Sequence, residues 1–192
     1  MIFVSINPFA LKRFFFFLLA AIGFSCLSAF GQSLLLTVKS TPYDRQMNRI
    51  RPILNAETHP VQGQISLSLV NRWMGDLRSI PYGFTQEWKT PEETQSGEPA
   101  DCKAKAVALY ETMTAHGATH VRLVIGKRTP ASRSTHAWLE WDTEEGSYLL
   151  DPTWNWKAYS SREVSRRSYI PYYAYEGPRK FRAAQAALVA QN

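Results

Sequence analysis

One helical pattern followed by three short apolar runs limits the possible folds of this chain more than any other feature. Residues 102–116 carry apolar side chains at helical spacing, and the apolar runs follow at residues 120–126, 135–141 and 147–151. Alternation and aromatic content indicate strands, and the loops between them are short and polar. Each strand therefore runs back beside the one before it. We predict an α+β fold, in which N-terminal helices and a cysteine-bearing helix pack on an antiparallel sheet.

The rest of the chain has weaker patterns. Residues 42–55 and 64–80 are predicted helices. In the second of them the apolar residues at steps of four are Ile65, Leu69, Trp73 and Leu77. Residues 84–99 are polar and rich in turn formers, which favours a surface loop. Residues 178–192 have the pattern of a terminal amphipathic helix. The aromatic stretch 154–175 either lines a substrate groove or packs on the sheet, and we expect packing, which is the commoner use of aromatic residues.

The first 31 residues have the pattern of a secretory signal peptide. Lys12 and Arg13 precede an unbroken apolar stretch, and small residues follow up to Gly31. We predict cleavage after Gly31, which leaves residues 32–192 as a single domain in the periplasm or outside the cell. The alternative is an uncleaved anchor, because a segment of about 18 apolar residues can cross a bilayer. After cleavage we expect no stable membrane insertion.

Composition excludes several other classes of protein. Apolar residues make up 45% of the 192 residues, which rules out a disordered chain. The net charge is +6, and loss of Lys12 and Arg13 with the signal peptide lowers it to +4. No basic cluster with interleaved aromatic residues is visible in the sequence, so nucleic acid is not an expected partner. Cleavage also removes Cys26, which leaves Cys102 as a lone thiol that is either buried or reactive.

Chain geometry brings Cys102, His136 and Asp151 to one end of the predicted sheet. The helix that starts at Cys102 rises roughly 22 Å, and the next strand runs back about 23 Å. The chain thus returns to the level of Cys102, and a short loop leads to His136. If the next hairpin turns in the middle of residues 142–146, His136 and Asp151 lie directly opposite each other, with Cβ atoms about 5 Å apart.

These three side chains form a predicted catalytic set. A thiolate at a helix start is favoured by the helix dipole, so Cys102 is the candidate nucleophile. His136 would take the thiol proton and deliver it to the leaving group, while Asp151 would fix the imidazole tautomer. Asp101 is the natural N-cap of the helix and opposes the thiolate, whereas Lys103 and Lys105 offset it.

Each residue taken alone also has an ordinary structural explanation, and the other histidines have no better one. Cys102 could be a small buried apolar residue, His136 a satisfied strand residue and Asp151 a turn residue. His59, His116 and His120 have no thiol or carboxylate at metal-ligand spacing. We therefore expect no bound metal and no cofactor.

Three segments resemble the transglutaminase-like cysteine peptidases, which have a papain-like fold. The segments are GEPADC at residues 97–102, HAWLEW at 136–141 and LLDPT at 149–153. The resemblance covers about residues 65–153 and points to a bacterial periplasmic branch that includes proteases of surface adhesins. It implies a Cys102, His136 and Asp151 triad.

The resemblance has one departure. Calcium-dependent members of that branch have acidic residues after the cysteine, whereas this chain has Lys103 and Ala104. A lysine ammonium repels a hard cation, so calcium control and the adhesin substrate are not expected.

The leading prediction for function is cleavage of a peptide or amide bond in a protein or peptide substrate, through a Cys102 thioester. The alternatives are a protein-crosslinking transglutaminase and a non-catalytic protein-binding module on the same fold. The Cys102 backbone N–H is one oxyanion donor. The second donor is open among four side chains, Tyr82, Gln86, Trp88 and Gln95, although we expect Trp88 to be a packing residue.

Overall fold

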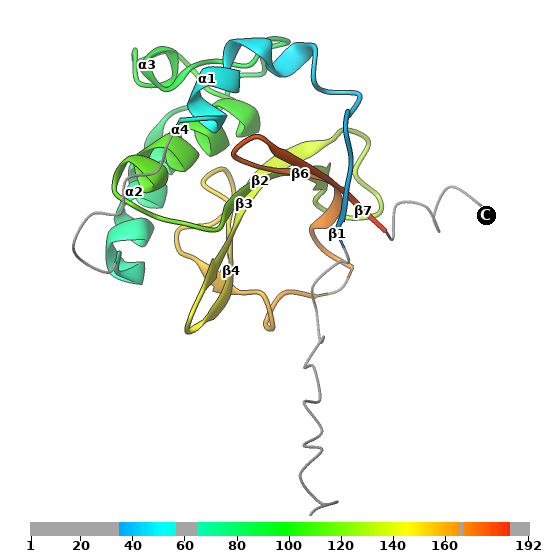
Figure 1. Ribbon diagram of the computed structural model, residues 1–192. Helices are drawn as coiled ribbons and strands as arrows, with labels where there is room; N and C mark the ends of the chain where they lie inside the picture. Colours follow the sequence, from blue (N-terminus) through cyan, green and yellow to red (C-terminus); the bar gives the residue numbers. More distant parts are fainter. Residues whose placement is uncertain (1–34, 57–64, 166, 185–192) are drawn as a thin grey trace, which may run out of the picture. The chain divides into compact units, whose positions relative to one another are not determined.

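The computed structural model describes residues 35–56, 65–165 and 167–184, all within one compact unit that spans Gly31–Asn192 (Figure 1). They form an α+β fold with one seven-stranded sheet, and every pair of neighbouring strands is antiparallel. The predicted fold class is therefore confirmed. The predicted signal peptide, residues 1–31, lies outside the described residues, so its presence and cleavage stay predictions.

The helices gather on one side of the sheet in Figure 1. They are η1 (Gln46–Arg49), α1 (Arg51–Leu54), α2 (Leu67–Ser79), α3 (Pro91–Thr94) and α4 (Cys102–Ala115). The strands are β1 (Leu35–Thr37), β2 (Val121–Lys127), β3 (His136–Thr143), β4 (Gly146–Leu150), β5 (Tyr159–Ser160), β6 (Ile170–Glu176) and β7 (Arg179–Ala183). Their order in the sheet is β1-β7-β6-β2-β3-β4-β5. Within the described residues no helix is both long and apolar enough to cross a membrane.

Helix α4 lies at the centre of the core. It packs on β2 and β3, and α1, α2 and α3 contact its other sides. Nine of its residues are buried, which is more than one helix face can supply: Cys102, Ala104, Lys105, Ala106, Val107, Ala108, Leu109, Tyr110 and Met113. Three of the nine are alanines, and such short side chains let neighbouring elements approach closely. The sequence predicted one buried apolar face of this helix. The other faces are buried because helices α1, α2 and α3 pack around α4.

The two N-terminal helical patterns are confirmed in part. Residues 42–55 form the short helices η1 and α1 in place of one helix, and Met47, Ile50 and Leu54 are buried as the pattern requires. Helix α2 begins after the N-cap Ser66, whose hydroxyl accepts a hydrogen bond from the Leu69 amide at 3.3 Å. Its buried residues are Val70, Met74 and Leu77. Of the apolar residues at steps of four, Leu77 is buried, and Ile65 and Trp73 are half-buried and pack against the core.

Residues 84–99 are more ordered than the predicted surface loop. Thr90 and Glu93 form a capping box that starts α3, and Pro91 occupies the first turn of this short helix. Trp88 and Thr94 are buried against the core. The segment is polar in composition, yet its few apolar groups cover the first half of α4.

The predicted C-terminal helix is wrong where the structure can test it. Arg179–Ala183 forms strand β7, which pairs with β6 on one side and β1 on the other. A turn at Gly177, whose φ is +57°, joins β6 to β7. Open edges of β6 and β1 supply backbone partners here, and such tertiary pairing overrides a weak local helical pattern. Residues 185–192 lie outside the described part of the chain.

Gly126 lets three strands meet beside the predicted site. It pairs with His136 across β2 and β3, and the register with β6 shifts between Ile125 and Gly126. A Cβ at this position would lie 2.1 Å from the Ile170 carbonyl oxygen and 2.7 Å from Cη2 of Trp138. Any side chain at Gly126 must therefore push β6 or Trp138 away.

We predict that Gly126→Ala destabilises the fold, because the added methyl meets backbone that cannot yield cheaply. The expected loss is about 1–3 kcal/mol, or a fall in Tm of about 3–10 °C. Gly75→Ala is the matched control, since a Cβ there has no neighbour within 4 Å and α2 gains helix propensity. Thermal unfolding followed by circular dichroism measures both changes. Equal Tm values for the two variants would contradict the tight packing at Gly126.

Candidate active site

Cys102 is the first residue of α4 and has a free thiol. Only 8% of its surface is exposed. Asp101 caps the helix, because its carboxylate accepts a hydrogen bond from the Ala104 amide at 3.1 Å. Lys103 forms an ion pair with the same carboxylate and donates to the Thr85 carbonyl at 2.8 Å. The expected compensation of Asp101 by Lys103 is therefore present beside the sulfur.

Lys105 has a different place from the one expected. Its ammonium donates to the Ile80 carbonyl at 2.5 Å, at the C-terminal end of α2. Burial lowers its pKa, and the nearby positive charge of Arg78 acts in the same direction. Lys105 thus links α4 to the end of α2, and the charge of Asp101 is compensated by Lys103.

His136 and Asp151 are in direct contact. Nε2 of His136 lies 2.7 Å from Oδ2 of Asp151, and both side chains are buried. His136 is the first residue of β3, whereas Asp151 directly follows β4. The structure therefore brings together the pair that the sequence placed at this end of the sheet.

The predicted hairpin register is wrong, although the contact forms. Thr143 pairs with Gly146, so the turn has two central residues and Leu139 pairs with Leu150. If this register is continued by one residue, Asp151 lies opposite Trp138. His136 is then the diagonal neighbour of Asp151. The true and predicted registers differ by two positions, and a shift of two keeps a side chain on the same face of a sheet. Diagonal side chains remain within reach of a long ring.

The Asp151 carboxylate is fully buried and accepts four hydrogen bonds. Oδ2 accepts from His136 and from the Tyr169 hydroxyl at 2.9 Å. Oδ1 accepts from the backbone amides of Thr153 at 3.0 Å and Trp154 at 3.3 Å. Donors of this kind stabilise a charge that burial would otherwise disfavour, and they fix the direction of each oxygen.

Tyr169 is a site residue that sequence reasoning missed. Its φ is +53°, a conformation that is uncommon for a residue other than glycine, and its amide donates to the Arg128 carbonyl at 2.8 Å. Burial and the Asp151 charge both raise the pKa of its phenol, so the hydroxyl keeps its proton and donates. Nothing in the sequence distinguishes Tyr169 from the other tyrosines near it.

The environment of His136 favours its protonated form. Burial by itself lowers the pKa, but the hydrogen bond to Asp151 and the neighbouring Cys102 outweigh burial and raise the pKa from 6.5 to about 9. The effect of Cys102 on this pKa places the thiol beside the imidazole. Because Nε2 is engaged by Asp151, Nδ1 is the nitrogen left for the thiol. Trp138 stacks on the ring, with centroids 6.1 Å apart, and restrains its rotation.

The structure separates the candidates for the second oxyanion donor. Gln86 and Gln95 are exposed. Trp88 is buried, and its indole N–H has no hydrogen-bond partner among the described residues. Burial raises the pKa of the Tyr82 phenol, and the charges of Cys102 and Asp101 raise it further. Tyr82 therefore lies near the sulfur. Trp88 and Tyr82 therefore remain as candidates, Trp88 because its buried indole N–H has no partner among the described residues and Tyr82 because Cys102 affects its pKa.

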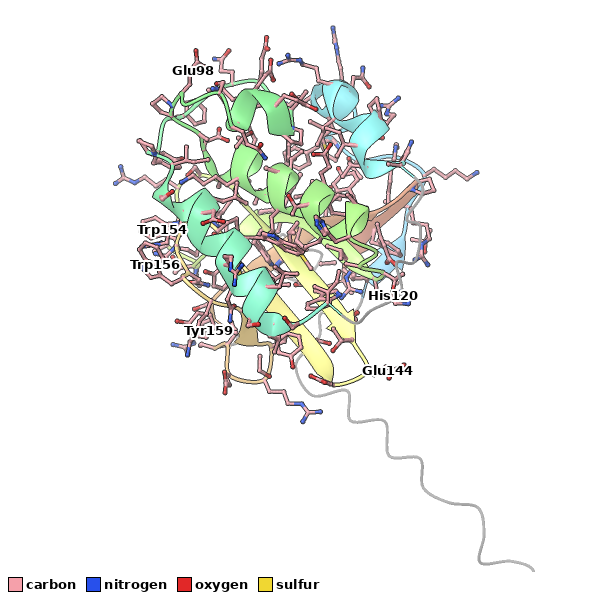
Figure 2. All side chains as sticks on the ribbon, turned by 90° about the vertical axis from the view of Figure 1, so that its left-hand side faces the viewer. Glu98, His120, Glu144, Trp154, Trp156 and Tyr159 are labelled. Carbon is pink, nitrogen blue, oxygen red and sulfur yellow. The ribbon has the colours of Figure 1, made fainter. Side chains whose placement is uncertain are left out.

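The other histidines lie apart from these residues. The His116 ring contacts the Thr112 carbonyl oxygen at 2.7 Å and packs on Trp73. Nδ1 of His120 lies 3.4 Å from Oε1 of Glu176. Figure 2 places His120 on the opposite side of the molecule from Trp154. His59 lies outside the described residues. Within the described ranges no group of three or more His, Cys, Asp or Glu side chains could hold a metal ion.

No family model and no curated protein matches the sequence of this chain significantly. Solved structures do match the fold. Calcium-bound LapG of Legionella pneumophila superposes with a TM-score of 0.51 and 16% identity, over 76% of this chain and 82% of LapG. EGTA-treated LapG gives a TM-score of 0.52 and 15% identity, over 77% and 81%. The chain has the fold of LapG.

This likeness confirms, for the fold, the resemblance to transglutaminase-like cysteine peptidases with a papain-like core. At such identities it shows the fold alone. A putative cysteine protease from Cytophaga hutchinsonii also matches, with a TM-score of 0.40 over 59% of this chain and 39% of that one, which is too low to support an inference. Roles for individual residues therefore rest on the geometry of this chain.

We predict that Tyr169→Phe slows the reaction of Cys102 with iodoacetamide about tenfold at neutral pH, because Asp151 loses a donor that orients it toward His136. The folded state should persist, since the ring is retained. Peptide mapping by mass spectrometry separates Cys102 from Cys26. Tyr148→Phe is the matched control, because Tyr148 packs on Trp141 near the turn of the β3–β4 hairpin.

The pH profile of the Tyr169→Phe reaction distinguishes a positioning role from a structural one. A positioning role changes the midpoint of the profile, whereas loose packing lowers the rate equally at every pH. A profile identical to that of the unchanged protein, at an identical rate, would contradict the role given to Tyr169.

Proposed function

We propose that this chain is a thiol enzyme that cleaves a peptide or amide bond, with Cys102 as nucleophile, His136 as general acid and base, and Asp151 as the group that orients His136. The observation that carries this proposal is the pair of contacts made by one imidazole. Its Nε2 lies 2.7 Å from an oxygen of the buried Asp151 carboxylate, and the thiol at the start of α4 lies close enough to raise its pKa. Nucleophile, base and orienting group in this order are the parts that acyl transfer requires.

The first half of the proposed reaction forms a thioester. The Cys102 thiol gives its proton to His136, and the sulfur attacks the carbonyl carbon of the substrate. The carbon–nitrogen bond then breaks as His136 returns this proton to the leaving amine. The acyl group remains on the sulfur, and the amine departs.

Hydrolysis completes the cycle. His136 takes a proton from water, the resulting hydroxide attacks the thioester carbon, and the carbon–sulfur bond breaks. The carboxylic acid leaves, and the sulfur regains its proton from His136. The Cys102 amide stands at the first turn of α4, where helix N–H groups have no intrahelical partner, and it supplies one donor to the oxyanion.

Hydrogen bonds from the backbone amides of Thr153 and Trp154 support the proposed role of Asp151. They hold the carboxylate still while His136 alternates between charged and neutral forms. A fixed carboxylate keeps Nδ1 directed at the thiol and stabilises the imidazolium that each half-reaction forms.

Water is the proposed acyl acceptor, and the proposed place of action is the periplasm or the outside of the cell. The proposed location rests on the signal-peptide pattern of residues 1–31. A lysine amine as acceptor would make the same thioester chemistry a crosslinking reaction. Incubation with a peptide mixture and dansylcadaverine separates the two, because crosslinking attaches the fluorescent amine to peptides and hydrolysis produces new carboxyl ends.

We predict that Asp151→Asn leaves the fold intact and lowers turnover by orders of magnitude; for the serine-protease triad the corresponding loss is about 10⁴-fold. The amide presents the wrong hydrogen-bonding group to Nε2 and removes a charge that stabilises the imidazolium. The fall should lie in kcat more than in KM. The assay follows cleavage, by mass spectrometry, of a mixture of synthetic peptides that together contain every pair of neighbouring residues.

The pH dependence gives the same prediction a second readout. His136 is protonated below its pKa of about 9 and neutral above it, so its role as proton donor is present below that pH and lost above it. The alkaline limb of activity should therefore lie near pH 9 and move to lower pH in Asp151→Asn. Full turnover in Asp151→Asn, or an alkaline limb near the ordinary histidine value, would contradict the proposed triad.

We predict that calcium does not control this enzyme. Lys103 and Ala104 follow the cysteine, and Lys103 is already paired with Asp101, so a calcium ion would meet a positive charge there. Activity and Tm should stay the same in millimolar calcium and in EGTA. A Tm increase of several degrees at micromolar calcium would show that other ligands hold the ion and would overturn the prediction.

A further inference from the structure

Exposed aromatic side chains occur in two segments, residues 82–84 and 154–159, that adjoin the candidate active site. The large apolar side chains that are exposed, among the described residues, are Leu36, Tyr82, Phe84, Trp154, Trp156 and Tyr159. The last five are aromatic, and we refer to them as the aromatic rim. Phe84 is 74% exposed and Trp156 62% exposed, so these rings are not packed as core residues. Figure 2 shows Trp154, Trp156 and Tyr159 together on one side of the molecule.

The rim is joined to the catalytic residues by direct contacts on both sides. The Trp154 amide donates to Oδ1 of Asp151 at 3.3 Å. On the other side, the Ala100 amide donates to the Pro81 carbonyl at 2.9 Å, and the Gly83 amide donates to the Ala100 carbonyl at 3.4 Å. These bonds hold Tyr82 next to the residues that lead into Cys102. Both segments of the rim therefore adjoin residues of the candidate site.

Four of the five rings each have a cation over one face. Arg78 lies 4.6 Å from the Trp156 ring centroid, and Arg128 lies 4.6 Å from that of Trp154. The remaining pairs are Lys103 with Phe84, at 5.1 Å, and Lys157 with Tyr159, at 5.8 Å. A ring attracts a cation through its quadrupole and leaves the positive charge in place. Each pair thus presents an apolar surface beside a full positive charge.

Most of these charges have no acidic partner. Lys103 is paired with Asp101, but among the described residues Arg78, Arg128 and Lys157 have no carboxylate within ion-pairing distance. Arg78 instead donates to the Thr153 carbonyl at 2.8 Å, which keeps its charge close to Asp151. The rim is therefore aromatic and carries three cations that have no acidic partner among the described residues.

We propose that the aromatic rim and its cations bind an acidic peptide segment of the substrate, in which Asp or Glu side chains flank the bond that Cys102 attacks. This inference rests on the proposed function, because it assigns the substrate class of that site. Carboxylates would pair with Arg78, Arg128 and Lys157, while the apolar parts of the peptide lie on the rings. Single-stranded nucleic acid also binds surfaces of rings and cations. The peptide is favoured because the rim adjoins Asp151 and the segment before Cys102, where the proposed function requires a peptide or amide substrate.

The test compares peptide probes that differ only in flanking charge. Each probe carries one chloroacetamide group, flanked by Asp, Asn or Lys residues, and the rate of Cys102 labelling is measured for each. The acidic probe should react about tenfold faster than the Asn probe, since two or three exposed ion pairs contribute. The ratio should shrink as sodium chloride is raised, because exposed charges are screened. Equal rates for the three probes, beside normal labelling by iodoacetamide, would overturn the substrate class and leave the proposed function standing.

Variants assign the effect to the rim. The Arg128→Gln, Lys157→Gln double variant should lower the Asp-to-Asn rate ratio from about ten to below about three. The ratio is the readout, so a general change in thiol reactivity cancels. The Arg179→Gln, Arg182→Gln variant removes the same charge from strand β7 and should keep the ratio of the unchanged protein. A ratio that falls equally in both variants would show an effect of net charge alone and would contradict the inference.

A binding measurement decides the inference even if Cys102 is inert. Fluorescein-labelled forms of the three peptides, without the reactive group, and a thymidine decanucleotide are titrated with the protein and followed by anisotropy. Tighter binding of the acidic peptide supports the inference whatever the chemistry at Cys102. Tighter binding of the decanucleotide assigns the rim to nucleic acid, and absence of any preference among the peptides overturns the proposal.

Discussion

The buried Asp151 carboxylate is the constraint around which the candidate site is arranged. A charge without solvent must be met by donors, and four donors from three parts of the chain converge on it. His136 arrives from β3, Tyr169 from the segment before β6, and the two amides from the turn after β4. Satisfying this one group therefore fixes the relative positions of three segments, and it directs the imidazole toward the start of α4.

Helix α4 sets the other half of the geometry. Because it is enclosed by the sheet and by three helices, its N-terminus cannot shift without disturbing the core. Its short alanine side chains allow this close enclosure, and Asp101 with Lys103 fixes its first turn. The thiol therefore stands on a rigid element, as a nucleophile with a defined direction of attack requires.

The outer surface of the site differs from its interior. Inside, Asp151 is paired with His136 and Asp101 with Lys103, whereas the rim presents rings and cations to solvent. An interior of this kind can carry one chemistry for many substrates, because the triad contacts only the reacting atoms. In the proposed function, choice of substrate depends on side chains such as Trp154 and Arg128, which lie outside the set of Cys102, His136 and Asp151.

The sequence by itself determined the local elements and the neighbourhood of the site. Periodicity placed α2, α4 and the three strands β2, β3 and β4, and their lengths brought Cys102, His136 and Asp151 to one end of the sheet. The pairing of His136 with Asp151 survived an error of two positions in register, because side chains alternate with a period of two. These features depend on contacts between elements that follow one another in the sequence, so the spacing of the residues predicts them.

Only the tertiary structure decided the rest. Strand β7 formed where the sequence suggested a helix, because the free edges of β6 and β1 offered backbone partners that no local pattern reveals. Tyr169 reached Asp151 through a positive φ and a long-range amide contact with Arg128, and neither leaves a mark on composition or spacing. Whether an aromatic ring is buried or exposed likewise depends on what lies over it, so the rim became visible only once the sheet and helices were assembled.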